Sequence, residues 1–84
     1  MGNDEINKSE QMWEIQNWIK HKLKPPAKPR NKIKIESINH VFSWDSCMYY
    51  PIYAIIIGLE LEGYVINKHK SGVYYVRADF MPNQ

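Results

Sequence analysis

The chain has 84 residues, enough for one small domain with a modest hydrophobic core, and its 44% hydrophobic and 13% aromatic residues are typical of a folded protein. The single Cys47 excludes an internal disulfide and a zinc site built from several cysteines, and no apolar run is long enough to cross a bilayer. The polar, acidic N-terminal residues are unlike a signal peptide, so we expect a cytoplasmic protein, in a host cytoplasm or associated with a nucleoid.

The net charge of +2 conceals an uneven distribution along the chain. Residues 36–67 contain four acids and no lysine or arginine, and Lys68, Lys70 and Arg77 follow them. The seven cations of residues 20–34, a segment without acids, are Lys20, Lys22, Lys24, Lys28, Arg30, Lys32 and Lys34. Positive charge concentrated in this way is typical of surfaces that contact phosphates.

The first predicted element is a helix. Ser9 suits its N-cap, and the helix should end near Lys24 because Pro25-Pro26 cannot continue it. We expect residues 1–8, before the helix, to be a flexible arm. The stripe at helical spacing that we expect to be buried consists of Met12, Ile15, Ile19 and Leu23, with Trp18 beside it. Trp13 lies on the far side, where we expect it to be partly exposed.

The middle of the chain predicts a loop, a short strand and a second helix. Residues 25–31 are rich in proline and basic side chains, which favours a stiff loop. The alternation of lysine and isoleucine in residues 32–35 predicts a strand. A helix then opens at Glu36 or Ser37, and residues 43–46 are expected to be the polar turn that follows it. The inward side chains of this helix should be Ile38, Val41 and Phe42.

The third predicted helix ends at a glycine and leads into a β-hairpin. Pro51 suits the first helical turn, where its missing N–H is not needed, and Gly63 suits the C-terminus, where the backbone takes a positive φ. The inward face should consist of Ile52, Ile55, Ile56 and Leu59. Residues 64–67 and 73–77 predict the two strands of the hairpin, and residues 68–72 its polar turn.

A helix, a glycine stop and a hairpin with a basic tip resemble the end of a winged helix-turn-helix domain. The run Leu59-Glu60-Leu61-Glu62-Gly63-Tyr64-Val65 is similar to the L-E-x-E-G signature, followed by two hydrophobic residues, that closes the recognition helix in bacterial and archaeal regulators of this superfamily. Pro51-Ile52 is similar to the pattern of the GntR type. The spacing of Tyr53, Ile56 and Leu59 is similar to that of the PadR and MarR types.

The resemblance implies a small α/β (α+β) domain of three helices, a short strand and a C-terminal hairpin wing. The domain would span residues 9–77 and be followed by a tail, residues 78–84. The resemblance also implies a small transcriptional regulator, dimeric, that contacts double-stranded DNA mainly through the basic loop and the basic wing. The candidate DNA-binding residues are Lys28, Arg30, Lys32, Lys34, Tyr49, Tyr50, Tyr53, Lys68, His69, Lys70 and Arg77.

The side chains expected on the outward face of the third helix favour a second hypothesis. In the families that the chain resembles, the outward positions of this helix usually carry Arg, Lys, Asn, Gln or Ser to contact base edges. None of the residues here is basic, and none can bind guanine as a bidentate fork. Apolar surface of this kind is typical of a protein interface. The chain would then be a winged-helix interaction module that binds a protein partner, and its interface candidates are Trp13, Tyr53, Ala54, Ile57 and Gly58.

Catalytic and metal-binding patterns are weak in this sequence. His21, His40 and His69 lie on three different predicted elements, and none pairs with a cysteine or carboxylate at ligand spacing. Of the three, His40 is the candidate for a buried histidine. Cys47 has no identifiable base, and no glycine-rich loop is present to cradle a phosphate. We therefore expect no enzyme, no metal site and no cofactor.

Overall fold

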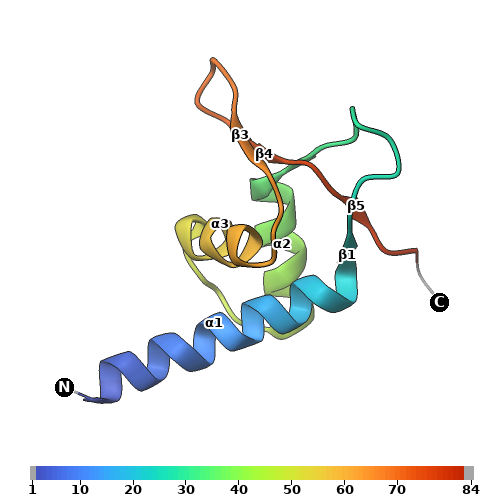
Figure 1. The fold of residues 1–84 in the computed structure, drawn as a ribbon. Coiled ribbons are helices and arrows are strands. Elements are labelled where there is room, and N and C mark those ends of the chain that lie inside the picture. Colours follow the sequence, from blue (N-terminus) through green and yellow to red (C-terminus); the bar gives the residue numbers. More distant parts are fainter. Residues whose placement is uncertain (1, 83–84) are drawn as a thin grey trace.

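Three helices pack around one core, and short antiparallel strands border that core (Figure 1). The computed structural model describes the backbone of residues 2–82 and the side chains of residues 10–82. The elements in chain order are α1 (Gly2–Lys22), β1 (Leu23–Lys24), β2 (Ile33–Lys34), α2 (Ile35–Ser46), α3 (Ile52–Leu61), β3 (Ile66–Lys68), β4 (Tyr74–Val76) and β5 (Asp79–Phe80). The chain is a small α+β domain with three helices, which confirms the α+β class predicted from the sequence.

The first helix begins and ends earlier than the sequence predicts. α1 starts at Gly2, so the segment expected as a flexible arm is helical from there on, and Ser9 lies inside the helix instead of capping it. Met1, the remaining residue of that arm, lies outside the described residues. At the other end Leu23-Lys24 is extended, because Pro25 disfavours the helical conformation in the residue before it.

The second helix extends further than expected and includes the residues predicted as a turn. The hydroxyl groups of Ser43 and Ser46 donate to the backbone carbonyls of His40, at 2.8 Å, and Phe42, at 2.7 Å. These polar side chains are therefore satisfied within the helix, where serine often bonds back to the preceding turn. Cys47, with a φ of 58°, ends α2 in the left-handed conformation, and residues 47–51 connect it to α3.

The third helix and its glycine stop agree with the sequence prediction. Pro51 directly precedes α3, and Gly63 takes the expected positive φ of 89°. The backbone N–H of Gly63 donates to the carbonyl of Glu60, and that of Tyr64 to the carbonyl of Leu59, each at 3.0 Å. These bonds satisfy carbonyls that the end of a helix leaves without partners.

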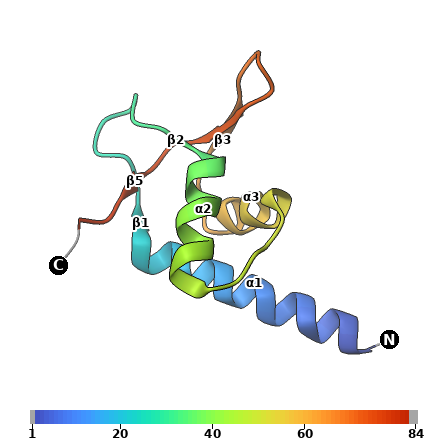
Figure 2. The same cartoon turned by 180° about the vertical axis from the view of Figure 1, so that it is seen from behind.

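A three-stranded antiparallel sheet has the order β2-β4-β3, so the short strand before α2 joins the C-terminal hairpin. The hairpin strands are shorter than predicted, and their turn is closed by a hydrogen bond of 2.7 Å from the N–H of His69 to the carbonyl of Val73. Ile33 and Ile66 both pair with Val76, which places these three side chains on the face toward the core. Figure 2, seen from behind, shows the hairpin projecting beyond the helices.

The residues expected to form a C-terminal tail are largely integrated into the fold. Ala78 is fully buried, and β5 pairs with β1 in a second, two-stranded sheet. The carboxylate of Asp79 accepts hydrogen bonds from the N–H of Ala27 and the side-chain amide of Asn31, both at 2.9 Å. Residues 83–84 of the predicted tail lie outside the described residues.

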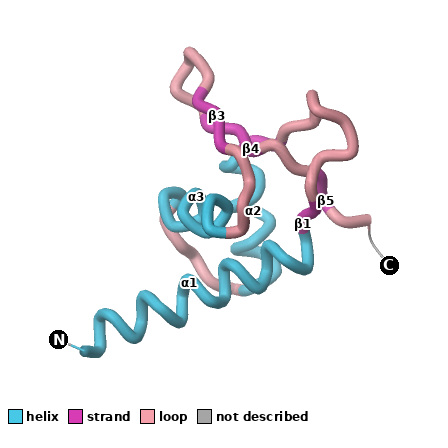
Figure 3. The backbone as a smooth tube through the Cα atoms, in the orientation of Figure 1, coloured by secondary structure: helices cyan, strands magenta, loops and turns pink. Residues whose placement is uncertain are grey.

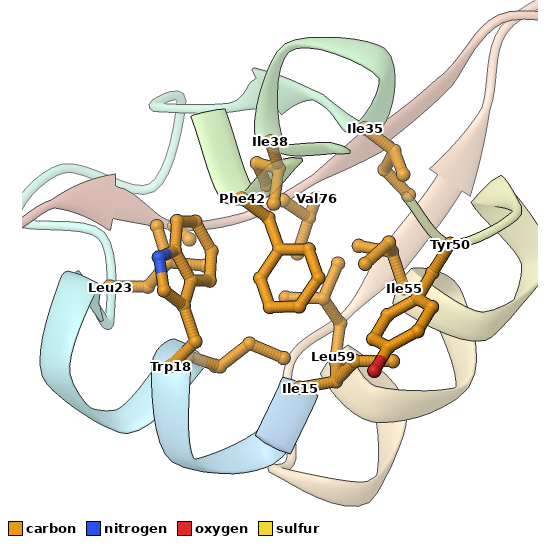
Figure 4. Close-up of a cluster of buried hydrophobic side chains, with 12 residues drawn as sticks. Ile15, Trp18, Leu23, Ile35, Ile38, Phe42, Tyr50, Ile55, Leu59 and Val76 are labelled. Carbon is orange, nitrogen blue, oxygen red and sulfur yellow. The ribbon is translucent and has the colours of Figure 1, made fainter. Parts of the chain in front are cut away.

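The core contains most of the side chains that the helical spacing predicts. Its buried members are Ile15, Trp18, Ile19, Leu23, Ile35, Ile38, Phe42, Tyr50, Ile55, Leu59, Val76 and Ala78. Phe42 lies between two aromatic rings, with its centroid 5.4 Å from both Trp18 and Tyr50 (Figure 4). The Trp18 indole donates to Asp45 at 3.0 Å, so its one polar atom is satisfied. The predicted inward residues Met12, Val41, Ile52 and Ile56 are half-buried at the edge of this core.

Candidate nucleic-acid interface

The face of the three-stranded sheet that is turned away from the core is polar and basic. Side chains alternate along each strand, so the residues paired next to the buried Ile33–Val76–Ile66 row lie on the opposite face. Those residues are Lys34, Tyr75 and Asn67, with Tyr75 on the central strand. Apolar side chains thus anchor the sheet on one face, and the other face is free to bind a ligand.

Tyr75 is surrounded by cationic and aromatic groups. The ammonium of Lys32 lies 4.5 Å from the centroid of the Tyr75 ring, and the ring of His69 meets it edge-on with centroids 6.2 Å apart. Lys34 is the cross-strand neighbour of Tyr75 on β2, and Arg77 follows on the same face of the extended chain. Three strands therefore bring one aromatic ring and several cations together.

The loop of residues 25–32 is held beside the sheet by specific contacts (Figure 3). The guanidinium of Arg77 donates to the carbonyl of Pro29 at 2.9 Å, and the N–H of Asn31 donates to the carbonyl of Lys28 at 3.0 Å. Asp79 holds the same loop from β5 through Asn31. The cations Lys28 and Arg30 are exposed on this fixed loop, close to the end of the sheet.

The hairpin tip adds further cations. Lys68, His69 and Lys70 are all exposed, and the ammonium of Lys68 lies 5.6 Å from the centroid of Tyr74. The backbone N–H of Ser71 donates to Nδ1 of His69, which leaves Nε2 as the outward ring nitrogen. The tip and the loop of residues 25–32 rise on the same side of the molecule (Figure 1).

We call the surface formed by the fixed loop, the outer face of the sheet and the hairpin tip the basic face. Its residues are Lys28 and Arg30 on the loop, Lys32, Lys34, Tyr75 and Arg77 on or directly beside the sheet, and Lys68, His69 and Lys70 at the tip. Residues 23–35 and 63–78, which carry it, contain no aspartate or glutamate. The one ion pair observed among the described side chains joins Lys22 to Asp45, and both residues lie outside the basic face. The cations of the basic face therefore have no carboxylate partner there and are available to an anionic ligand. Sequence reasoning identified all of these residues except Tyr75, whose position depends on the strand register.

Tyr50, predicted as a DNA contact, is instead a core residue. Its side chain is only 9% exposed, and its hydroxyl donates to the carboxylate of Glu14 at 3.0 Å. Burial, followed by this hydrogen bond and the negative charge of Glu14, raises the pKa of Tyr50 above its ordinary value of 10.0. The prediction failed because Tyr50 precedes α3 and turns toward α1, where Glu14 satisfies its hydroxyl.

Gly58, predicted to face outward as part of an interface, is buried against α1. A Cβ atom at this position would lie 2.5 Å from Cγ2 of Ile15, so only glycine permits the observed approach of the two helices. Gly58 therefore belongs to the packing of α1 on α3. His40, considered as a buried histidine, is exposed beside the Trp44 ring, with centroids 5.6 Å apart.

The remaining interface candidates do not form one surface. Tyr53 and Ile57 are 66% and 43% exposed, and with the half-buried Ala54 they line a groove of about 350 Å³ between α1 and α3. Trp13, 66% exposed, borders a different groove, on the side of α1 that faces α2. Tyr49 precedes α3 and is exposed.

Metal clusters and membrane-spanning helices were also sought among the described residues. Within residues 10–82 no three His, Cys, Asp or Glu side chains lie close enough together to hold a metal ion. None of the described helices is both long and apolar enough to span a bilayer. Comparison of the chain with known proteins gave no match to a family model, to a curated protein or to a solved structure.

Proposed function

We propose that the chain is a small DNA-binding protein of the winged helix-turn-helix type, a transcriptional regulator whose contacts are mainly to phosphates. The observation that carries the proposal is the basic face, where seven lysine and arginine side chains gather without a carboxylate partner. They are Lys28, Arg30, Lys32, Lys34, Lys68, Lys70 and Arg77. Phosphate contacts of this kind supply most of the affinity of sequence-independent binding.

The order of the elements supports the winged-helix part of the proposal. After α1 come the strands β1 and β2, then α2 and α3, and then the hairpin strands β3 and β4. β1 pairs with β5 outside this scheme, whereas β2 joins the hairpin as the third strand of its sheet. In this scheme the hairpin is the wing and α3 corresponds to the recognition helix. The exposed side of α3 carries Tyr53, Ile57 and Leu61 and no cation, so we expect little direct reading of base edges.

Binding to duplex DNA at increasing salt tests the proposal. Each phosphate contact contributes about 0.9 to the slope of log affinity against log salt concentration. We expect Lys68→Ala combined with Lys70→Ala to weaken binding about equally for different sequences and to lower the slope by about two. The matched control, Lys20→Ala with Lys22→Ala, removes the same charge from α1 and should leave the slope unchanged. Equal slopes for the parent and the hairpin variant would remove the wing from the binding surface.

A second candidate function is a protein-interaction module, and it is favoured by the exposed apolar side of α3. Tyr53, Ile57 and Leu61 are exposed by 66%, 43% and 60%. Large apolar side chains grouped on one helix of a small protein are typical of an interface, with a second copy of the chain as the simplest partner. Absence of DNA binding at low salt, together with self-association through α3, would favour this function over the first.

A further inference from the structure

Tyr75 is placed where a flat ligand would meet the basic face. It lies in β4, the central strand, and its neighbours on the same face are Lys34 on β2 and Asn67 on β3. The ammonium of Lys32 and the ring of His69 also lie beside it, 4.5 Å and 6.2 Å from its centroid. A partly exposed tyrosine among cations does not serve the core, which Val76 already fills from the other face of the same strand.

Phosphate binding alone does not require an aromatic ring, and duplex DNA offers this ring little to contact. In a duplex both faces of each base are stacked on neighbouring bases, and only the base edges reach the grooves. An unpaired base, in contrast, exposes its face and stacks on aromatic side chains whatever its identity. A positive surface that follows the phosphates, with an aromatic ring between the cations, is the combination that binds single strands.

We propose that the basic face binds single-stranded nucleic acid, with one base stacked on the ring of Tyr75 and the flanking phosphates held by Lys34 and Arg77. This inference rests on the proposed DNA-binding function and names the form of nucleic acid that the surface fits best. The strand would run from the hairpin tip across Tyr75 toward the loop of residues 25–32. Arg77 fixes that loop beside the sheet through Pro29, so Lys28 and Arg30 extend the same path.

Lys32 occupies the place of the base when no ligand is bound. Its ammonium lies 4.5 Å from the ring centroid, and its side chain is exposed and flexible. A cation over an exposed ring is held more weakly than a base stacked on it. The base therefore displaces Lys32, and the released ammonium stays beside the incoming strand, where it can pair with a phosphate. Tyr75 thus remains covered in both states.

The test compares a fluorescently labelled oligothymidine with the same strand annealed to oligodeoxyadenosine, at low salt and with the full chain. We expect Tyr75→Val to weaken binding of the single strand by about 5- to 150-fold, the range for loss of one stacked base, and to leave duplex affinity within about twofold. Tyr75→Phe keeps the ring and should bind both probes like the parent. Tyr74→Val is the matched control, because Tyr74 belongs to the same strand but lies on the opposite face of the sheet from Tyr75.

Each outcome bears on the inference. Selective loss of single-strand binding in Tyr75→Val supports it. An equal loss for both probes, or a parent that prefers the duplex, overturns it and leaves the proposed function standing. A parent that binds neither probe refutes the proposed function as well. Thermal denaturation shows whether Tyr75→Val is folded. If it is not, the NMR chemical shifts of the Tyr75 ring protons in the parent, measured with and without oligothymidine, decide, since a stacked thymine moves them and an unstacked one does not.

Discussion

Replacing Gly58 by alanine measures how closely α1 approaches α3. The added Cβ would lie 2.5 Å from Cγ2 of Ile15 and 3.3 Å from Cδ1 of Ile19. The first of these methyl groups is attached to the branched Cβ of a fully buried side chain, so it moves only if χ1 or the whole helix moves. Overpacking of a core typically costs about 1–3 kcal/mol, and this contact belongs in the upper half of that range.

Helix propensity acts in the opposite direction. Alanine is favoured over glycine within a helix by about 1 kcal/mol. Subtracting this gain from a clash of about 2–3 kcal/mol predicts that Gly58→Ala lowers the free energy of unfolding by about 1–2 kcal/mol. In a domain of this size each kcal/mol changes the melting temperature by about 4–8 °C, so the expected loss is roughly 4–16 °C.

Thermal and urea denaturation followed by circular dichroism give this quantity directly. The double variant Gly58→Ala with Ile15→Leu removes the branched methyl group that meets the new Cβ, so it should lose less stability than the two single variants together. An outward-facing glycine, as the sequence predicts, would instead gain stability on replacement by alanine. A Gly58→Ala protein more stable than the parent would therefore refute the close packing of α1 on α3.

Three further predictions concern the core, α3 and pH. Leu59→Ala should lower the free energy of unfolding by about 2–5 kcal/mol, because Leu59 is fully buried; a melting temperature within a few degrees of the parent's would contradict its place in the core. Ile57→Lys should leave the melting temperature unchanged and dissociate a dimer formed through α3. Sedimentation velocity of the parent and the variant measures this, and a variant that stays dimeric would show that the two chains pair through another surface. Stability should decline as the pH rises above about 10, because the pKa of Tyr50 is raised in the folded state and the unfolded state releases this proton first. Urea denaturation at successive pH values measures the free energy of unfolding, and in Tyr50→Phe this free energy should fall less steeply with pH. An unchanged fall would show that other groups cause the loss of stability.

Periodicity was sufficient to predict the helices and most of the core. Ile15 and Ile19 on α1, Leu23 directly after it, and Ile55 and Leu59 on α3 are buried as their spacing indicates. Large apolar side chains identify the buried face of a helix because their burial dominates its stability. The same rule says little about helix ends: α1 begins earlier than predicted, and α2 continues through residues 43–46, where no proline or glycine stops it.

The errors occurred where a residue's environment is set by a distant part of the chain. Gly58 has no side chain to indicate which way it faces, and its burial depends on Ile15. Tyr50 has an amphipathic side chain suited to either environment, and Glu14 decides between them. The cations of the basic face were predicted because charge is visible in the sequence, whereas the position of Tyr75 follows from its pairing with Lys34, which the sequence alone does not specify.

The pairing of β1 with β5 also determines when the loop of residues 25–32 is formed during folding. This pairing joins Leu23 to Phe80, which lie far apart in the sequence, so most of the chain forms the loop that the pairing closes. Contacts between residues so far apart in the sequence form slowly. On a ribosome, α1, α2 and α3 are synthesised long before Phe80 and can pack together first. Asp79, which fixes the loop through Ala27 and Asn31, arrives with the same late segment. A nascent chain can therefore pack its three helices first, whereas Val76 and Ala78 complete the core, and the basic face is assembled, only once the last strands are present.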